Sequence, residues 1–284
     1  MINEHIELGV LNTLKVNRIT EPGIYLEAQD EEVVLLPNAY TTNEMLVDDE
    51  IEVFVYTDSE DRLISTTQKP YGMKDQFMFT RVVDVVPFGA FVEWGLLKDL
   101  FVPKNRQKNP FREGDMRIVR IVQDDESERL IGVEKITSFL NSDTSALEKN
   151  EKVDLLVFAK TPMGYKVIIN NTYEGMIYKN EIFTDVEVGK EIVGYIKNIR
   201  EEDGKVDVSL QPIGKTITDD VNTQKVMDVL SQNFNELPYN YKTDADTIKD
   251  MFGISKKAYK RALTKLVDDK MIKLDDEGMT KIQE

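Results

Sequence analysis

Two aromatic residues flank a glycine near the middle of the chain, in the stretch Phe88-Gly-Ala-Phe91. An apolar run rich in β-branched residues precedes them, which predicts a strand that bends at the glycine. Aromatic rings exposed on a β-surface can stack on nucleobases, and each stacked base contributes about 1–3 kcal/mol without base-specific hydrogen bonds. The alternative is that both rings belong to the core of a β-protein. The order of the surrounding elements favours a stacking surface formed by Phe88 and Phe91.

A basic loop follows this strand. It carries four cations, Lys104, Arg106, Lys108 and Arg112, beside Phe111. Cations next to a stacking surface attract the phosphates of a nucleic-acid backbone. A solvated loop without a ligand is the alternative. We expect these four side chains to form an electrostatic rim for the aromatic pair.

A second set of cations lies near the C-terminus, on a helix predicted over residues 256–269. The set consists of Lys256, Lys257, Lys260, Arg261 and Lys265. Spacings of three to five residues place the last four on a shared side of the helix. Because base edges are usually read by Arg, Asn or Gln, a set made mostly of Lys predicts contacts with phosphates. A solvated helix face and packing against a barrel are the alternatives.

Composition excludes several classes of chemistry. The chain has no Cys and one His, His5, so thiolate metal sites and most His-based catalysis are excluded. No phosphate-binding glycine loop or serine-hydrolase motif occurs, and the carboxylate pairs Asp124-Asp125 and Asp275-Asp276 lie in predicted turns. We expect no catalytic residue, no metal and no cofactor. Since no apolar run is long enough to span a membrane and no signal peptide is evident, a cytoplasmic protein without a membrane partner is expected.

Charge is distributed unevenly. The net charge of −16 opposes bulk affinity for phosphate. Residues 1–68 carry 3 basic and 15 acidic side chains, a net charge of −12, whereas residues 69–140 carry 12 basic and 11 acidic side chains, a net charge of +1. A nucleic-acid site is therefore expected outside the first segment, which is suited to a structural role or to a protein partner.

Three positions recur in three copies, which indicates an internal repeat. The copies are marked by Gly23, Gly89 and Gly164, then 14 residues later by Pro37, Pro103 and Tyr178, and finally by Arg62, Arg129 and Lys205. An acidic residue stands four positions before each late cation, at Asp58, Asp125 and Glu201. Short β-branched runs separated by turns are typical of a five-stranded barrel. We predict barrels over residues 1–68, 69–138 and 150–211.

The period of the pattern becomes helical after the third barrel. Residues 212–222 are expected to form a linker. A first helix is then predicted by the spacing of its apolar residues, Val226, Val229, Leu230 and Phe234. A second helix has Thr243 as its predicted N-cap and ends at Gly253, and Ser255 caps a third.

A hairpin over residues 271–282 completes a winged helix-turn-helix over residues 219–284. The predicted fold class is therefore mainly β with a C-terminal α+β domain: three tandem OB-fold barrels followed by a winged helix.

The middle repeat resembles an S1 RNA-binding domain. The resemblance rests on Phe88-Gly-Ala-Phe-Val92, on Asp99-Leu-Phe-Val-Pro103, on Gly114-Asp115, and on Asp125 with Arg129. In S1 domains two aromatics, a His, and a late Asp and Arg form the RNA face. The resemblance therefore implies that Phe88, Phe91, Asp125 and Arg129 bind RNA, while Pro103 stands at the position of the usual His.

The outer repeats keep less of the S1 pattern. The first has Tyr25 and Arg62 but Pro22 at the first aromatic position. The third has Met163 and Lys166 at the aromatic positions, Tyr178 at the His position, and Lys205 as its late cation. Lys166, Tyr178 and Lys205 are therefore further candidate RNA-binding residues.

Three S1-like barrels followed by a winged helix resemble the CvfB family of bacterial RNA-binding regulators, named as conserved virulence factors. The resemblance implies a non-enzymatic protein that binds single-stranded RNA, mainly through the second barrel, and acts in post-transcriptional regulation. Alternatives are a DNA-binding transcription regulator acting through the winged helix, and an interaction scaffold that docks through the acidic first barrel on a ribosome or RNA-processing machinery. A nuclease is the weakest alternative, because no cluster of metal-binding carboxylates is evident. The sequence does not define the oligomeric state, and a monomer is favoured.

Overall fold

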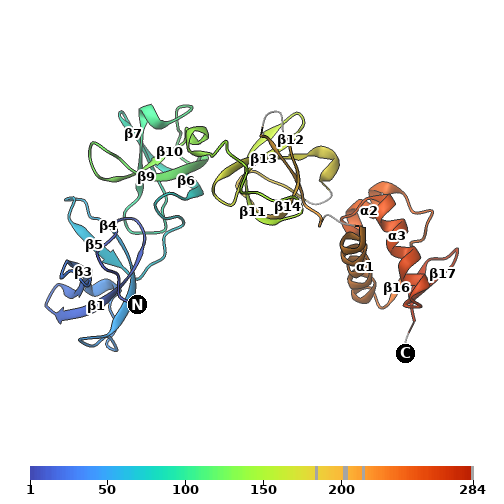
Figure 1. The fold of residues 1–284 in the computed structure, drawn as a ribbon, viewed down its shortest axis with the longest axis horizontal. Coiled ribbons are helices and arrows are strands. Elements are labelled where there is room, and N and C mark those ends of the chain that lie inside the picture. The colour runs from blue at the N-terminus through green and yellow to red at the C-terminus, as the bar shows by residue number, and fades with distance from the viewer. Residues whose placement is uncertain (183–184, 201–203, 213–214, 283–284) are drawn as a thin grey trace. The chain divides into compact units, whose positions relative to one another are not determined.

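The computed structural model describes residues 1–182, 185–200, 204–212 and 215–282. Figure 1 shows β-rich modules that precede a helical C-terminal module. The predicted fold class is confirmed, because three barrel-like sheets are followed by a winged helix. The chain divides into two compact units, Met1–Phe139 and Leu140–Glu284.

Unit 1 contains two modules that we call barrel 1 and barrel 2. Barrel 1 consists of β1 (Leu11–Ile19), β2 (Gly23–Glu27), β3 (Val33–Pro37), the 3-10 helix η1 (Asn38–Tyr40), β4 (Glu50–Thr57) and β5 (Leu63–Thr66). Barrel 2 consists of β6 (Phe77–Val86), β7 (Gly89–Val92), β8 (Leu100–Pro103), η2 (Lys104–Arg106), β9 (Met116–Gln123) and β10 (Leu130–Val133), and η3 (Ile136–Phe139) follows it.

Unit 2 contains barrel 3 and the winged helix. Barrel 3 consists of β11 (Lys152–Thr161), β12 (Gly164–Ile169), β13 (Tyr173–Tyr178), η4 (Lys179–Glu181), β14 (Glu191–Ile199) and β15 (Val206–Ser209). The winged helix consists of α1 (Lys215–Gln232), β16 (Glu236–Leu237), α2 (Ala245–Phe252), α3 (Lys256–Asp268), β17 (Ile272–Leu274) and β18 (Met279–Lys281).

The three barrels share one strand order. Barrels 1 and 3 are closed, with the orders β1-β2-β3-β5-β4 and β11-β12-β13-β15-β14. Barrel 2 has the equivalent order β10-β9-β6-β7-β8, but it is an open five-stranded sheet in which β8 and β10 are the two edges. Side chains of β8 pack across this opening against the backbone of β10, because a Cβ atom added to Gly132 would lie 2.8 Å from a methyl carbon of Val102. Side-chain packing therefore replaces the missing backbone ladder.

The 14-residue spacing of the repeat is explained by strand pairing. Gly23 pairs with Pro37, Gly89 with Pro103, and Gly164 with Tyr178, each across an antiparallel ladder. A β-bulge also recurs about six residues before each of these glycines, in β1, β6 and β11. Bulges bend a strand and increase its twist. The repeated spacing therefore records one barrel geometry used three times.

Barrels 1 and 2 share a hydrophobic core. The buried indole of Trp94, which follows β7, packs edge-on against Phe54 at 5.6 Å and Tyr56 at 6.5 Å between ring centroids. Its Nε1 donates a hydrogen bond to the Gly72 carbonyl at 2.8 Å. Phe54 and Tyr56 belong to β4 of barrel 1, and the same cluster includes Leu100 of barrel 2. These aromatic contacts hold the two barrels together.

Two sequence predictions in the winged helix are wrong. Residues 215–222, predicted as part of a linker, belong to α1. Phe234, predicted on the apolar stripe of the first helix, is 97% exposed because α1 ends at Gln232 and Phe234 has a positive φ of 57°.

The N-cap of α2 is also one residue from its predicted place. Asp244 caps the helix, and its carboxylate accepts hydrogen bonds from the backbone of Asp246 and Thr247. Thr243 instead accepts a hydrogen bond from the backbone N–H of Asn240 at 2.9 Å. The predicted Ser255 cap and the end of α2 at Gly253 are both present.

We predict that Trp94→Ala lowers the free energy of unfolding of unit 1 by about 3–5 kcal/mol, as expected when a large buried aromatic side chain is removed. Chemical denaturation of the full chain measures this effect. Leu97→Ala, at a side chain that is 80% exposed, is the control and should change stability by less than about 0.5 kcal/mol. Equal effects of the two substitutions would contradict a shared core organised around Trp94.

Candidate nucleic-acid interface

Three phenylalanines, not two, form the aromatic surface of barrel 2. Phe88 lies in the β6–β7 turn and is 66% exposed, while Phe91 on β7 is half-buried. Phe101 on β8 lies between them, with ring centroids 5.7 Å from Phe88 and 5.3 Å from Phe91. Sequence reasoning missed Phe101, although its pairing with Phe91 follows from the same ladder that sets the 14-residue spacing. We call these three residues the aromatic platform.

Gly89 makes room for the platform. A Cβ atom at this position would lie 2.5 Å from two atoms of the Phe101 ring and 2.6 Å from the Val102 carbonyl oxygen. These distances are far below van der Waals contact, so any side chain here would displace the ring. The absence of a side chain at Gly89 therefore leaves the space that the Phe101 ring needs.

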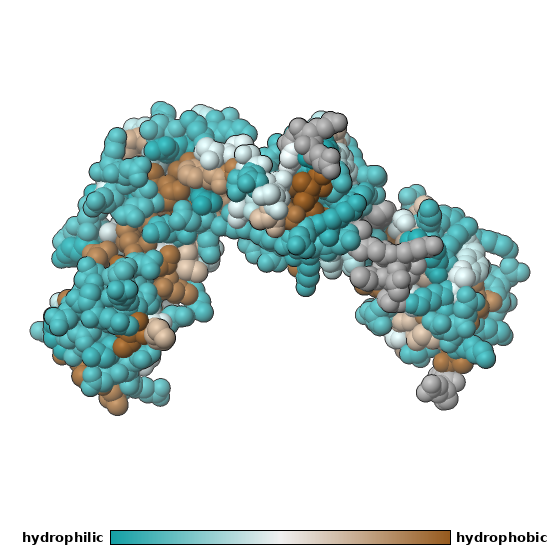
Figure 2. Space-filling view, in the orientation of Figure 1, coloured by the Kyte–Doolittle hydropathy of each residue, from teal (hydrophilic) through white to brown (hydrophobic). Residues whose placement is uncertain are grey.

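The platform lines a groove of about 340 Å³ in unit 1. Barrel 2 contributes the platform together with Trp94, Lys98, Asp99, Leu100, Arg129, Leu130 and Ile131, and barrel 1 contributes Thr57, Ser59 and Asp61. Figure 2 shows apolar residues reaching the surface of unit 1 within a mainly hydrophilic exterior. The groove thus combines ring faces with a small number of charged groups.

Two charged groups in the groove are partly desolvated. The Lys98 ammonium donates hydrogen bonds to the carbonyls of Thr57 and Asp58, both at 2.8 Å, and burial lowers its pKa. Burial, followed by the nearby Glu93 carboxylate, raises the pKa of Asp99. Lys98 therefore fixes the β4–β5 turn of barrel 1 against barrel 2.

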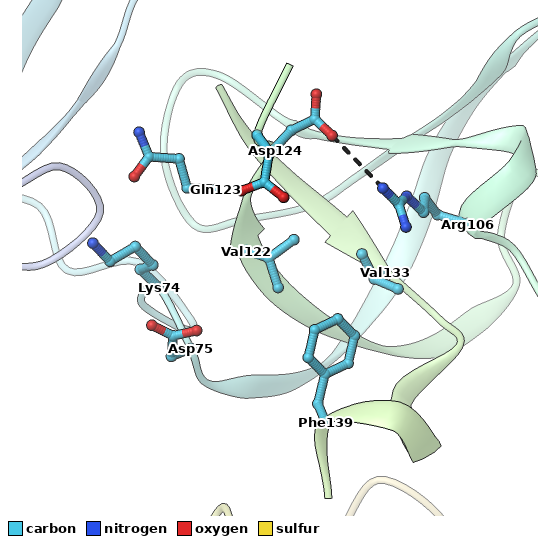
Figure 3. Close-up of a pocket in the computed structure, with 9 residues that line it drawn as sticks. Lys74, Asp75, Arg106, Val122, Gln123, Asp124, Val133 and Phe139 are labelled. Carbon is cyan, nitrogen blue, oxygen red and sulfur yellow. Dashed lines mark ion pairs between the residues drawn. The ribbon is translucent and has the colours of Figure 1, made fainter. Parts of the chain in front are cut away.

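The two late charged residues implied by the S1 resemblance lie in different places. Arg129 lines the groove and forms an ion pair with Asp61 of barrel 1. Asp125 lines a separate pocket, which Figure 3 shows around Lys74, Phe139 and the Arg106–Asp124 ion pair. Asp125 and Arg129 thus line different pockets, because Asp124 and Arg129 close the β9–β10 turn and leave Asp125 at its tip.

The predicted basic rim is exposed. Lys104, Arg106, Lys108 and Arg112 all have solvent-exposed side chains. The backbone N–H of Lys104 donates to the Phe88 carbonyl at 2.9 Å, which places the start of this loop beside the platform. Phe111, in contrast, is buried and takes no part in the surface.

Barrel 3 brings its three candidate residues together. Lys166, Tyr178 and Lys205 line one pocket of about 370 Å³. Arg200, which sequence reasoning missed, donates hydrogen bonds there to the Tyr178 hydroxyl and to Asp207. Lys166 forms an ion pair with Glu174 at 2.7 Å. This pocket is rich in ion pairs, whereas the barrel 2 groove is rich in rings.

The equivalent surface of barrel 1 is occupied by its own side chains. The guanidinium of Arg18 lies over the Tyr25 ring at 4.1 Å. Arg62 is bound by Asp58 at 2.7 Å and by Glu60 at 3.1 Å. Asp58, the acid predicted four residues before the late cation of barrel 1, thus forms an ion pair with that cation, Arg62. Glu201, the corresponding acid of barrel 3, lies outside the described residues.

The five predicted cations of α3 differ in exposure. Lys257 and Lys260 are exposed, whereas Lys256, Arg261 and Lys265 are half-buried. The opposite face packs into the core of the winged helix through Tyr259, Leu263 and Leu266 together with two alanines. α3 therefore offers two exposed cations in its N-terminal half.

The described residues contain no group of three or more His, Asp or Glu side chains placed to hold a metal ion. In the same part of the chain, no helix is long and apolar enough to cross a membrane.

Comparison with known proteins supports this architecture. Residues 8–68 match the S1 domain family, and residues 224–280 match the CvfB-like winged helix domain family. These matches confirm the predicted resemblance to the CvfB family. The matched S1 segment is barrel 1, not the barrel 2 stretch from which the S1 resemblance was inferred.

Similar proteins extend over most of the chain. Uncharacterized protein YitL of Bacillus subtilis is 28% identical, over 90% of this chain and 87% of its own length. Conserved virulence factor B of Staphylococcus epidermidis is 24% identical, over 96% of this chain and 94% of its own length. A solved multidomain protein with nucleic acid binding domains from Streptococcus pneumoniae is 23% identical, with a TM-score of 0.42 over 97% of this chain and 98% of that one.

Proposed function

We propose that this protein is a non-enzymatic, cytoplasmic regulator that binds single-stranded RNA mainly through barrel 2. Barrel 3 and the winged helix provide additional contacts. The observation that carries the proposal is the aromatic platform, whose rings line a groove and are not all absorbed into the core. Post-transcriptional control is the regulatory role that such binding would serve.

The chemistry of the groove favours an unpaired base over a duplex. Ring faces can stack on any base, but a base that is still paired and stacked in a helix does not expose its face. A duplex is held mainly through its phosphates, and the groove offers few cations for them. A single strand can instead place bases on the platform and its backbone along the exposed loop that begins at Lys104.

The winged helix and barrel 3 fit a supporting role. Lys257 and Lys260 can each contact a phosphate, but neither has the planar, forked guanidinium that makes Arg suited to bidentate recognition. In the barrel 3 pocket, Lys166 and Arg200 are held by carboxylates and provide a positioned surface of nearly balanced charge. Barrel 3 and the winged helix would therefore increase the length of RNA that is bound, and would contribute little to the choice of RNA sequence.

We predict that Phe88→Ala combined with Phe101→Ala weakens binding of a single-stranded RNA oligonucleotide by at least about 10-fold, because the variant removes up to two stacking interactions of about 1–3 kcal/mol each. Fluorescence anisotropy with the full chain measures the affinity. Tyr71→Ala is the matched control, since Tyr71 is an aromatic of the same region that is 59% exposed and does not line the groove. Unchanged affinity in the double variant, with circular dichroism showing an intact fold, would overturn the proposal.

The basic loop should affect salt dependence more than stacking. Replacing Lys104, Arg106, Lys108 and Arg112 by Gln should reduce the slope of log affinity against log salt concentration by up to about 0.7 for each phosphate that is no longer neutralised. The Phe88→Ala/Phe101→Ala variant should bind more weakly while keeping the slope of the wild type. Titrations at several salt concentrations distinguish the two effects, and an unchanged slope in the loop variant would remove this loop from the RNA path.

A further inference from the structure

Barrel 1 contributes a carboxylate to the groove that contains the aromatic platform. Asp61 lies in the β4–β5 turn, and its carboxylate forms an ion pair with the guanidinium of Arg129, 68 residues further along the chain. The side chains of Asp61 and Arg129 are 44% and 56% exposed, so both remain accessible to a ligand. Arg129 is the cation that the S1 resemblance assigns to RNA. Asp61 of barrel 1 thus forms an ion pair with the cation of barrel 2 that the resemblance assigns to RNA.

The turn that carries Asp61 is fixed in place. The Asp58 carboxylate accepts hydrogen bonds from the backbone N–H groups of Glu60 and Arg62, at 2.8 and 3.0 Å. Lys98 of barrel 2 holds the same turn through the carbonyls of Thr57 and Asp58. The packing of Trp94 on Phe54 keeps β4, which leads into this turn, against barrel 2. Asp61 is therefore held beside Arg129 by contacts on several sides.

The charges that line the groove balance one another. Its cations are Lys98 and Arg129, and its anions are Asp61 and Asp99. Lys98 is already engaged by two carbonyls, and Arg129 by Asp61. A phosphate entering the groove would have to displace a carboxylate from Arg129 and then lie close to that carboxylate. A neutral base faces no such competition and can use the ring faces directly.

We infer that Asp61 is a selectivity residue of this site: it occupies Arg129 and keeps phosphate out, so that the groove accepts an uncharged nucleobase while the RNA backbone stays outside. The inference rests on the proposed function for the identity of the ligand. It assigns to the acidic first barrel a direct part in that site.

The test uses two probes with the full-length protein: a single-stranded RNA oligonucleotide, and inorganic polyphosphate, which has the negative charge but no bases. Asp61→Asn removes the carboxylate charge from Arg129. It should raise RNA affinity by about three- to tenfold and steepen the salt slope by about 0.7, the value for one additional neutralised phosphate. It should also strengthen binding of polyphosphate relative to the wild type at the same salt concentration, because Arg129 then adds one cation to those of the exposed basic loop.

Two further variants separate a local effect from a change in net charge. Glu60→Gln removes one charge from the same turn, at a side chain that is 69% exposed and contacts Arg62, and it should leave both affinities nearly unchanged. Arg129→Gln should abolish the gain produced by Asp61→Asn when the two are combined. Equal effects of Asp61→Asn and Glu60→Gln would overturn the inference, as would a gain that persists without Arg129.

Failure of the proposed function would look different. If RNA binding does not depend on the platform, the proposed function fails, while polyphosphate binding still reports whether Asp61 screens Arg129. If Asp61→Asn gains affinity for neither probe, the selectivity role of Asp61 is refuted, whatever the platform does.

Discussion

The packing of Trp94 against Phe54 and Tyr56 is the contact on which the rest of unit 1 depends. It adds Phe54 and Tyr56 of β4 to the hydrophobic cluster of barrel 2, while the interior of barrel 1 forms a cluster of its own, and it places the β4–β5 turn beside the aromatic platform. Without this contact the groove would lack one wall, and Arg129 would lack its carboxylate partner. Barrel 1 thereby lines part of the groove, even though its own equivalent surface is filled by Arg18, Tyr25 and Arg62.

One barrel geometry gives three different surfaces in this chain. The ladder positions that hold Phe91 and Phe101 in barrel 2 hold Lys166 and Met176 in barrel 3. The backbone pairing is the same, but the exposed chemistry changes from rings to ions. A repeated fold therefore sets where a ligand can lie, while a few substitutions at equivalent positions set what that ligand can be.

Much of the fold could be predicted from the sequence, because local patterns record it. The 14-residue spacing corresponds to a real strand pair, and Ser255 and Gly253 mark helix ends through short-range hydrogen bonds and backbone geometry. The errors arose where neighbouring residues compete for one role, as Thr243 and Asp244 do for the N-cap. Phe234 was misplaced because an apolar residue one turn beyond Leu230 continues the pattern even though the helix has ended.

The candidate site was less predictable, since its decisive contacts link distant residues: the Arg129–Asp61 ion pair spans two barrels and leaves no periodic signal, and turn geometry directs Asp125 to another pocket.

An acidic protein can present an RNA site if stacking and phosphate contacts are kept apart. In unit 1 the rings lie in a groove of balanced charge, and the exposed cations of the basic loop begin where Lys104 meets Phe88. Because stacking does not require net positive charge, the charge of −12 on residues 1–68 need not oppose base binding. The same negative charge disfavours binding that depends on phosphate alone. An acidic composition is thus compatible with ligands that offer accessible bases, and in our proposal the ion pair between Asp61 and Arg129 is where the groove disfavours phosphate.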